Sequence, residues 1–262
     1  MFKNLIWKND RMLLNGLTYR LQHNKSESWE GGSDHFIFYK IKKLVDQYDT
    51  YFKNQPEQSQ PKNVVEIGMW DGGSAVFWNE ILKPKKLVGI DIIENGGNDY
   101  FQLYLKTTET LKPYWATDQA NAPRLRDIVK ENFGNEPLDL VFDDGSHMYA
   151  QTLASFNALF PFMAIGGIYI IEDWAWSHWQ NQEWTLPEGS EPTKLIQELV
   201  QASANEGLIE SINIFEGFVV VKRGVQPIQG SIENFNIKNH IYNRPLSFKA
   251  KVKTALRIFD LY

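Results

Sequence analysis

Cysteine is absent from this 262-residue chain. Its absence excludes disulfides, thiolate metal ligands and cysteine nucleophiles. It also suits a reducing compartment, so we expect the chain to act in the cytoplasm. Long apolar runs are absent as well, and the first residues, MFKNLIWKNDRMLL, carry scattered charges. The sequence therefore predicts neither a signal peptide nor a membrane span.

An excess of basic residues is also lacking, because the formal net charge is −5 and the sequence pI is about 5.6. Without a broad positive field we expect no nucleic-acid partner. Aromatic residues, in contrast, are abundant, with 9 Trp, 11 Tyr and 16 Phe. The chain can therefore build a sizeable core, and its length fits one large domain or a domain with a terminal extension.

Strand-like and helix-like patterns alternate between Asn63 and Arg223. The expected strands cover 64–68, 86–92, 138–142 and 166–173, and the expected helices begin at Ser74 or cover 149–160 and 192–204. Two further strands, 209–215 and 217–222, are expected to form a hairpin. This order predicts the α/β class, with a Rossmann-like, doubly wound and mainly parallel sheet that ends in an antiparallel hairpin.

The ends of the chain look different from its middle. We expect residues 1–60 to form a helical N-terminal extension, with a helix over 36–51, that covers a substrate pocket as a lid. Residues 61–225 then form the main domain, and 226–262 form a tail. The tail ends in LSFKAKVKTALRIFDLY, a basic amphipathic helix that could contact a membrane surface or a partner. The interpretation we favour is docking on its own domain or on a second subunit of a homo-oligomer.

Two expected strands end in acidic pairs, Asp143-Asp144 and Glu172-Asp173. Ligands of an open parallel sheet bind beyond the carboxyl ends of its strands, so four carboxylates would face one crevice. Crowded carboxylates raise each other's pKa unless a cation or a shared proton neutralises them. The pattern favours a hard divalent metal, and His147 is near enough to Asp144 in sequence to act there as a general base.

The turn after the first of these strands reads Glu66-Ile-Gly68-Met-Trp-Asp-Gly-Gly-Ser74. Glycines allow close approach of the backbone to a ligand, and the helix start offers free N–H groups. The spacing differs from the G-x-G-x-x-G of dinucleotide binders, whereas Asp91 at the next strand end can bind ribose hydroxyls. A nucleoside cofactor without a pyrophosphate fits this pattern better than a bare turn.

Structural roles compete for several of these residues. Asp143 can cap the helix that follows it or face the cofactor, and His147 can be structural rather than catalytic. His178 can face the substrate, but we expect it to pack. We expect His23, His35 and His240 to lie on the surface or the pocket rim. The tryptophans at 174, 176 and 179 stack on a sugar ring or cover the sheet edge, and at least one of them is expected in the core.

The segments EIGMWDGGSAVFWNEILKPKKLVGIDI, FDDGSH and GGIYIIEDW together resemble the class I S-adenosylmethionine-dependent methyltransferases. The chain is most similar to the metal-dependent sugar O-methyltransferases of macrolide tailoring, of the mycinamicin and macrocin types, and to the cephalosporin-hydroxylase group. The resemblance covers residues 33–175. At its start, Gly32-Ser33-Asp34 matches a short Thr-Asp-Lys element, with His35 in place of the lysine.

The resemblance implies S-adenosylmethionine as cofactor and Mg²⁺, or Mn²⁺, as metal. It assigns the metal to Asp144, Glu172 and Asp173, and the base to His147. The positions that it places around the cofactor are Glu66, Gly68, Asp91, Asp118 and Gln119. We add Ser74, at the helix start behind the glycine-rich turn, and Asp143 as further candidates for cofactor binding. The implied reaction is methyl transfer to a hydroxyl of a sugar or polyol in a natural product, where a metal and a base help because such hydroxyls hold their protons tightly.

Three other functions stay open. A nicotinamide-dependent oxidoreductase also uses a Rossmann-like sheet, but it should show G-x-G-x-x-G. An iron enzyme of the cephalosporin-hydroxylase kind would more often show two histidines and a carboxylate. A non-catalytic sugar-binding module would have a degenerate metal site, whereas Asp144, His147, Glu172 and Asp173 are all present.

Overall fold

The computed structural model describes residues 2–21, 34–55, 60–94, 96–179, 189–204 and 207–242. Within them the strands are β1 (Ile6–Lys8), β2 (Arg11–Leu14), β3 (Leu17–Leu21), β4 (Phe36–Phe38), β5 (Asn63–Ile67), β6 (Lys86–Ile90), β7 (Leu111–Tyr114), β8 (Leu138–Asp143), β9 (Met163–Glu172), β10 (Ile209–Ile214) and β11 (Phe218–Arg223). The α-helices are α1 (Lys42–Lys53), α2 (Gly73–Leu82), α3 (Asp99–Leu105), α4 (Ala122–Phe133), α5 (Tyr149–Leu159) and α6 (Pro192–Ser203). The amphipathic helix predicted in the tail and His23 lie outside the described residues.

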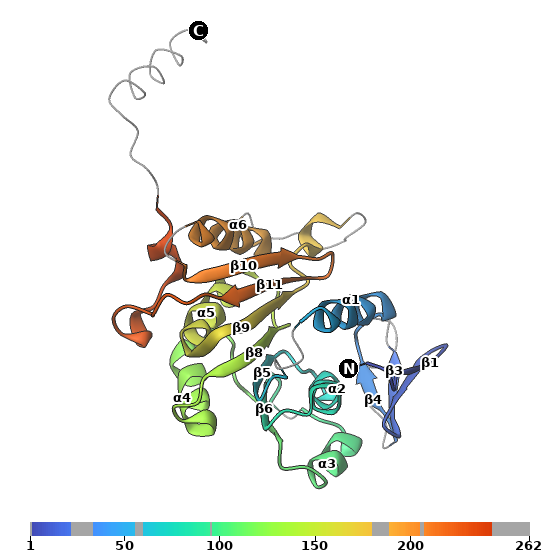
Figure 1. Ribbon diagram of the computed structural model, residues 1–262. Helices are drawn as coiled ribbons and strands as arrows, with labels where there is room; N and C mark the ends of the chain where they lie inside the picture. Colours follow the sequence, from blue (N-terminus) through green and yellow to red (C-terminus); the bar gives the residue numbers. More distant parts are fainter. Residues whose placement is uncertain are drawn as a thin grey trace, which may run out of the picture.

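The central sheet has seven strands in the order β10-β11-β9-β8-β5-β6-β7 (Figure 1). Strands β5 to β9 pair in parallel, and β11 and β10 complete the sheet as an antiparallel hairpin. The chain runs outward from β5 through β6 to β7 and then returns to the other side of β5 with β8. The carboxyl ends of β5 and β8 therefore flank the switch point, where open α/β sheets bind ligands. The predicted fold class is confirmed.

Helices cover both faces of this sheet. One hydrophobic cluster joins α1, α2 and α3 to the sheet through side chains such as Tyr48, Trp78 and Phe101. The other joins α4, α5 and α6 to the opposite face. Val64 belongs to the first cluster and Val65 to the second, since successive side chains of a strand point to opposite faces. A strand buried on both faces reads as a continuous apolar run, which is why β5 was predictable.

The N-terminal region differs from the helix predicted for it. Residues 6–38 contain a four-stranded sheet, β1-β2-β3-β4, and the helix begins at Lys42 rather than near Phe36. Asn15 and Gly16 adopt φ of 50° and 84°, the left-handed turn geometry that favours a hairpin. The prediction was wrong here because strands of three to five residues carry little periodic signal of their own, and the Asn-Gly turn between β2 and β3 was not recognised. Tyr19 and other residues of this sheet are buried in the same cluster as α1 and α2.

The C-terminal hairpin of the sheet was predicted from the sequence, whereas the segment after β6 was not. The hairpin of β10 and β11 is confirmed, with its turn at Glu216-Gly217 closed by a 2.9 Å hydrogen bond from the Phe215 N–H to the Phe218 carbonyl. The segment after Asp91, which carried no predicted element, contains α3 and the edge strand β7. Asn98 caps α3 by accepting from the Phe101 N–H.

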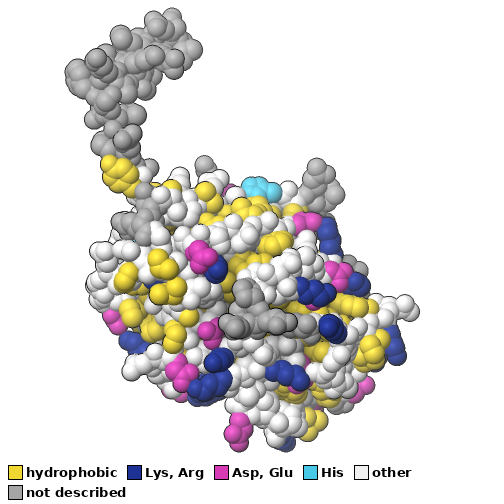
Figure 2. Space-filling model, in the orientation of Figure 1, with side chains coloured by type: hydrophobic (Ala, Val, Ile, Leu, Met, Phe, Trp, Pro, Cys, Tyr) yellow, Lys and Arg dark blue, Asp and Glu magenta, His cyan; other side chains and the backbone are white. Residues whose placement is uncertain are grey.

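Acidic and basic side chains are interspersed over the face drawn in Figure 2, and the described residues show no large basic area there. Among the described helices, none combines the length and the apolar character that crossing a membrane requires.

Candidate active site

Acidic residues gather beyond the carboxyl ends of four neighbouring strands. Glu66 lies in β5, Asp91 follows β6, Asp144 follows β8, and β9 ends at Glu172 with Asp173 next. The Asp144 N–H donates to the Ile67 carbonyl at 2.9 Å, which holds the end of β8 against β5. Asp144, Glu172 and Asp173 therefore meet at the switch point, in the crevice expected there, whereas Asp143, the fourth predicted carboxylate, is turned into a separate buried network.

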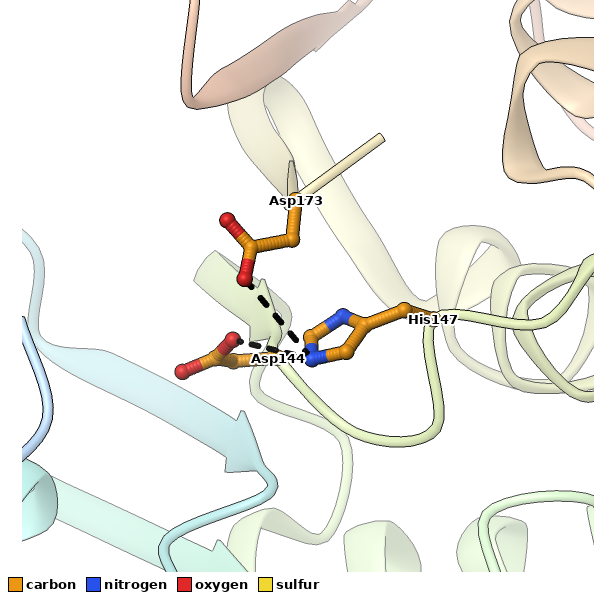
Figure 3. A group of neighbouring side chains, drawn as sticks. All are labelled: Asp144, His147 and Asp173. Atoms are coloured by element: carbon orange, nitrogen blue, oxygen red, sulfur yellow. Dashed lines mark ion pairs between the residues drawn. The ribbon is translucent and has the colours of Figure 1, made fainter. Parts of the chain in front are cut away.

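The carboxylates of Asp144 and Asp173 face the imidazole of His147 (Figure 3). The His147 Nε2 lies 3.8 Å from Asp144 Oδ1 and 4.0 Å from Asp173 Oδ2. One ligand atom from each of the three residues falls within 4.8 Å of the others, which is close enough for all three to surround one ion. Carboxylate oxygens with an imidazole beside them suit a hard or borderline divalent cation.

The backbone at this site is held in an uncommon conformation. His147 and Asp173 have φ of 54° and 49°, in the left-handed region that L-residues rarely adopt. Two hydrogen bonds fix them: the Trp176 Nε1 donates to the His147 carbonyl at 2.9 Å, and the Asp173 N–H donates to the Gly217 carbonyl at 2.8 Å. Such strain persists where surrounding contacts over-determine it, and it is frequent at functional sites.

Lys40 enters the crevice from the link between β4 and α1, and no pattern in the sequence pointed to this residue. Its Nζ lies 2.7 Å from Asp144 Oδ2 and 2.7 Å from each carboxylate oxygen of Glu172. The Lys40 side chain is 3% exposed and that of Glu172 is 2% exposed. Burial alone would lower the pKa of Lys40, but the adjacent carboxylates of Asp144 and Glu172 raise it above its usual range.

Burial dominates the pKa values of the other acidic groups. It raises the pKa of Glu172 and of Asp173 above their usual values. It raises the pKa of Glu66 to about 8, although the positive charge of Lys40 and the nearby Ser74 hydroxyl offset part of this rise. Glu66 is fully buried, and neither of its oxygens meets the geometry of a hydrogen bond to another described residue. A buried acceptor without a partner indicates a donor that the site binds.

The Gly-rich turn between β5 and α2 is held by Asp91. The Asp91 carboxylate accepts from the N–H groups of Met69 at 2.9 Å, Trp70 at 2.7 Å and Ile93 at 3.0 Å. Gly68 has φ of 83°, and a Cβ there would lie 2.0 Å from the Asp144 carbonyl oxygen. Only glycine allows the ends of β5 and β8 to approach each other this closely. Gly68 therefore has a structural role in the crevice, in addition to any contact that it makes with a ligand.

Asp143 is buried in a polar network behind the crevice. It accepts from the Gln119 Nε2 at 3.1 Å and from the Tyr169 hydroxyl at 2.6 Å, and also from the Ser155 hydroxyl. Burial raises its pKa to about 6. The capping role considered for Asp143 is wrong, because α5 begins after Met148 and has no side-chain cap. The Gln119 Oε1 accepts from the Ser146 N–H, so this side chain orients the loop after β8.

The remaining predicted cofactor positions lie at the start of helices or loops. Ser74 is the second residue of α2 and is half-buried. Asp118 is exposed and accepts from the Ala120 N–H at 2.8 Å.

Histidines outside the crevice have other contacts. His35 Nδ1 lies 2.7 Å from Asp34 Oδ1, the exposed His178 is 2.7 Å from the Thr193 hydroxyl, and His240 stacks on Phe235. Of the three tryptophans, Trp174 packs against the core, as expected for at least one of them, and Trp179 is 42% exposed.

Comparison with known proteins supports the predicted resemblance. Residues 65–174 match a family described as a methyltransferase domain. Over 139 residues the chain is 34% identical to a mycinamicin VI 2''-O-methyltransferase of Micromonospora griseorubida and 30% identical to an 8-demethyl-8-alpha-L-rhamnosyl tetracenomycin-C 2'-O-methyltransferase of Streptomyces olivaceus. The aligned segments are 50% of this chain but 31% and 33% of those proteins, so the chain spans about a third of their length.

Solved structures agree with these relatives. A methyltransferase named MycE, from the mycinamycin pathway, in complex with Mg, SAH and mycinamycin VI, matches with a TM-score of 0.54 and 26% identity, over 74% of this chain and 52% of that one. A second MycE structure, with Mg and SAH, gives a TM-score of 0.54 and 25% identity, over 74% and 53%. The predicted resemblance to sugar O-methyltransferases of this type is confirmed.

Proposed function

We propose that this chain, whose residues 65–174 form a methyltransferase domain, transfers a methyl group from S-adenosylmethionine to a hydroxyl of a sugar or polyol unit in a natural product. The observation that carries the proposal is the cluster of acidic residues and His147 at the carboxyl ends of the central strands. The domain match includes Glu66, Asp91, Asp144, His147 and the acidic end of β9, and the fold gathers them at the switch point. The relatives named as sugar O-methyltransferases support the acceptor class.

The cofactor is expected to lie over the carboxyl ends of β5 and β6. Both oxygens of Glu66 are buried acceptors that lack a hydrogen-bond partner of good geometry among the described residues, and they suit the α-ammonium group of the methionine tail. Asp91 already accepts three backbone N–H bonds, and its remaining lone pairs are available for the ribose diol. We keep Gly68, Ser74 and Asp118 as neighbours of the cofactor, and we assign Asp143 and Gln119 to the support of the loop between β8 and α5.

The donor set of Asp144 and Asp173 fits a divalent cation, Mg²⁺ or Mn²⁺, because Mg²⁺ is commonly held by one or two carboxylates and completes its shell with other oxygens. When bound, such an ion lowers the pKa of a coordinated hydroxyl and orients vicinal oxygens. The Mg in the MycE complexes supports a divalent cation as the metal.

His147 is the proposed general base. Its Nε2 points into the space between Asp144 and Asp173, and the hydrogen bond from Trp176 fixes the backbone from which the ring projects. In that position the Nε2 lone pair can accept the proton of the acceptor hydroxyl as its oxygen bonds to the methyl group. The neighbouring carboxylates then stabilise the imidazolium that results.

The N-terminal region is proposed to cover the pocket, as expected for residues 1–60. A Cβ on Gly73 would lie 2.0 Å from the Ile37 carbonyl oxygen, so this segment crosses directly over the start of α2. The next residues carry Lys40 into the crevice. Location in the cytoplasm and assembly into a homo-oligomer stay predictions.

Methyl transfer is tested by incubating the protein with S-adenosylmethionine, Mg²⁺ and a panel of glycosylated natural products, and by searching for methylated products by mass spectrometry. We expect S-adenosylhomocysteine and a methylated sugar in equal amounts. A rival nicotinamide-dependent oxidoreductase would instead bind NAD and leave every acceptor unmethylated.

A further inference from the structure

The carboxylate of Asp71 lies where three separate segments of the chain meet. Its Oδ1 accepts from the Gly73 N–H at 3.2 Å, within the turn between β5 and α2. Its Oδ2 accepts from the Ile37 N–H of β4 at 3.4 Å and from the Asn98 Nδ2 at 3.2 Å. Asn98 is the N-cap residue of α3, and its Nδ2 also donates to the His35 carbonyl at 3.1 Å. The Asp71–Asn98 pair therefore connects the glycine-rich turn, β4 and the start of α3.

These segments border the expected position of the cofactor. On its other side the glycine-rich turn is held by Asp91, which accepts from the Met69 and Trp70 N–H groups. Asp91 and Asn98 lie at the two ends of the connection from β6 to α3. The strand β4 continues to Lys40, which enters the crevice. The backbone around the proposed nucleoside site is thus tied together at Asp71, at a distance from the residues proposed to bind the cofactor.

We propose that Asp71 and Asn98 are positioning residues for the cofactor, and that their hydrogen bond holds the three segments in the arrangement that binds S-adenosylmethionine. This inference rests on the proposed function. A loop that is already held in its bound conformation loses less conformational freedom when the ligand binds, so the affinity is higher. The role needs no contact between either side chain and the cofactor.

The test measures the affinity of the full chain for S-adenosylmethionine by calorimetry. N–H donors face both oxygens of Asp71, so in Asp71→Asn either orientation of the amide sets a donor against a donor. We expect this variant to bind the cofactor about tenfold more weakly, the scale of a lost hydrogen bond to a charged group. Asp99→Asn makes the same change at the exposed residue after Asn98 and should keep the affinity of the wild type.

A second variant tests the other member of the pair. Asn98→Ser keeps a capping oxygen for α3 and removes the amide, so it should also weaken the cofactor about tenfold. Because both changes break the same hydrogen bond, Asp71→Asn should add little in the Asn98→Ser background. Additive losses would overturn the inference, since the two residues would then act separately.

Urea denaturation of each variant separates positioning from folding. Variants that are less stable but bind S-adenosylmethionine as the wild type does would contradict the inference and make the pair structural only. If Asp71→Asn does not fold, Asn98→Ser decides, and wild-type affinity in that variant would refute the inference. An unmodified chain that does not bind S-adenosylmethionine would refute the proposed function and this inference with it, whereas wild-type binding with unaffected variants would refute the inference alone.

Discussion

Glu66→Gln should stabilise the ligand-free protein, and the gain should grow with pH. Burial raises the pKa of Glu66 from 4.5 to about 8 on folding. A carboxyl with a raised folded pKa contributes stability that is intact below its unfolded pKa and is lost as the pH rises towards its folded pKa. The window of loss is therefore about pH 4.5 to 8. Glutamine has nearly the same shape and does not titrate, so the variant should escape this loss.

The size of the effect follows from the pKa difference. Since one pKa unit is about 1.36 kcal/mol, the wild-type protein should lose roughly 1 kcal/mol by about pH 5 and roughly 3 kcal/mol by about pH 7. The free energy of unfolding of Glu66→Gln relative to wild type should thus increase by about 2 kcal/mol between these two pH values. A constant cost of burying the amide cancels in this comparison.

Urea denaturation followed by circular dichroism at the two pH values measures the difference. Glu210→Gln is the control, because Glu210 forms an exposed ion pair with Lys222 and should change stability by at most about 1 kcal/mol at either pH. A stability difference for Glu66→Gln that does not change with pH would refute the argument that burial holds this carboxyl protonated. S-adenosylmethionine should bind the variant more weakly, which is the usual cost of replacing a destabilising functional residue.

Three further predictions concern cofactor, metal and base. Asp91→Ala should weaken the binding of S-adenosylmethionine by about 2 kcal/mol or more, which is the scale of hydrogen bonds to a charged group. An unchanged affinity in calorimetry would show that Asp91 does not bind the ribose. EDTA should abolish turnover, and Mg²⁺ should restore it. Asp144→Asn should lose most activity while its circular dichroism stays native. Full turnover in the presence of chelator would refute the role of the metal and would indicate methyl transfer by acid–base catalysis alone. His147→Ala should reduce kcat by ~10²–10⁴-fold, the usual contribution of a general base, with Mn²⁺ and cofactor affinity near wild type; a loss of Mn²⁺ binding would instead make His147 a ligand.

The central sheet was predictable because its strands carry their own signal. Strands β5, β8 and β9 are apolar on both faces, and the acidic residues at their ends are adjacent in sequence, as in Asp143-Asp144. Parallel pairing then brings these ends to one edge without further information. The short strands β1 to β4 were missed because three to five residues hold too little periodicity to outweigh helical spacing nearby.

The parts of the site that depend on contacts between residues far apart in sequence could not be predicted. Lys40 is 104 residues from Asp144 and 132 from Glu172 in sequence, and no local pattern marks it as different from Lys42 or Lys43. The same holds for Gln119, whose side chain holds Asp143 and the loop after β8. The residue types at the strand ends indicated the chemistry of the site, whereas the partition of its charges depends on the tertiary structure.

Calorimetric titration with S-adenosylmethionine, and with NAD in parallel, tests the central claim most directly, because it needs neither the acceptor nor turnover. The proposed function predicts one binding site per chain for S-adenosylmethionine, weakened in Glu66→Gln and Asp91→Ala, and no binding of NAD. If the protein binds NAD but not S-adenosylmethionine, or binds neither ligand, the assignment of this crevice to methyl transfer is contradicted.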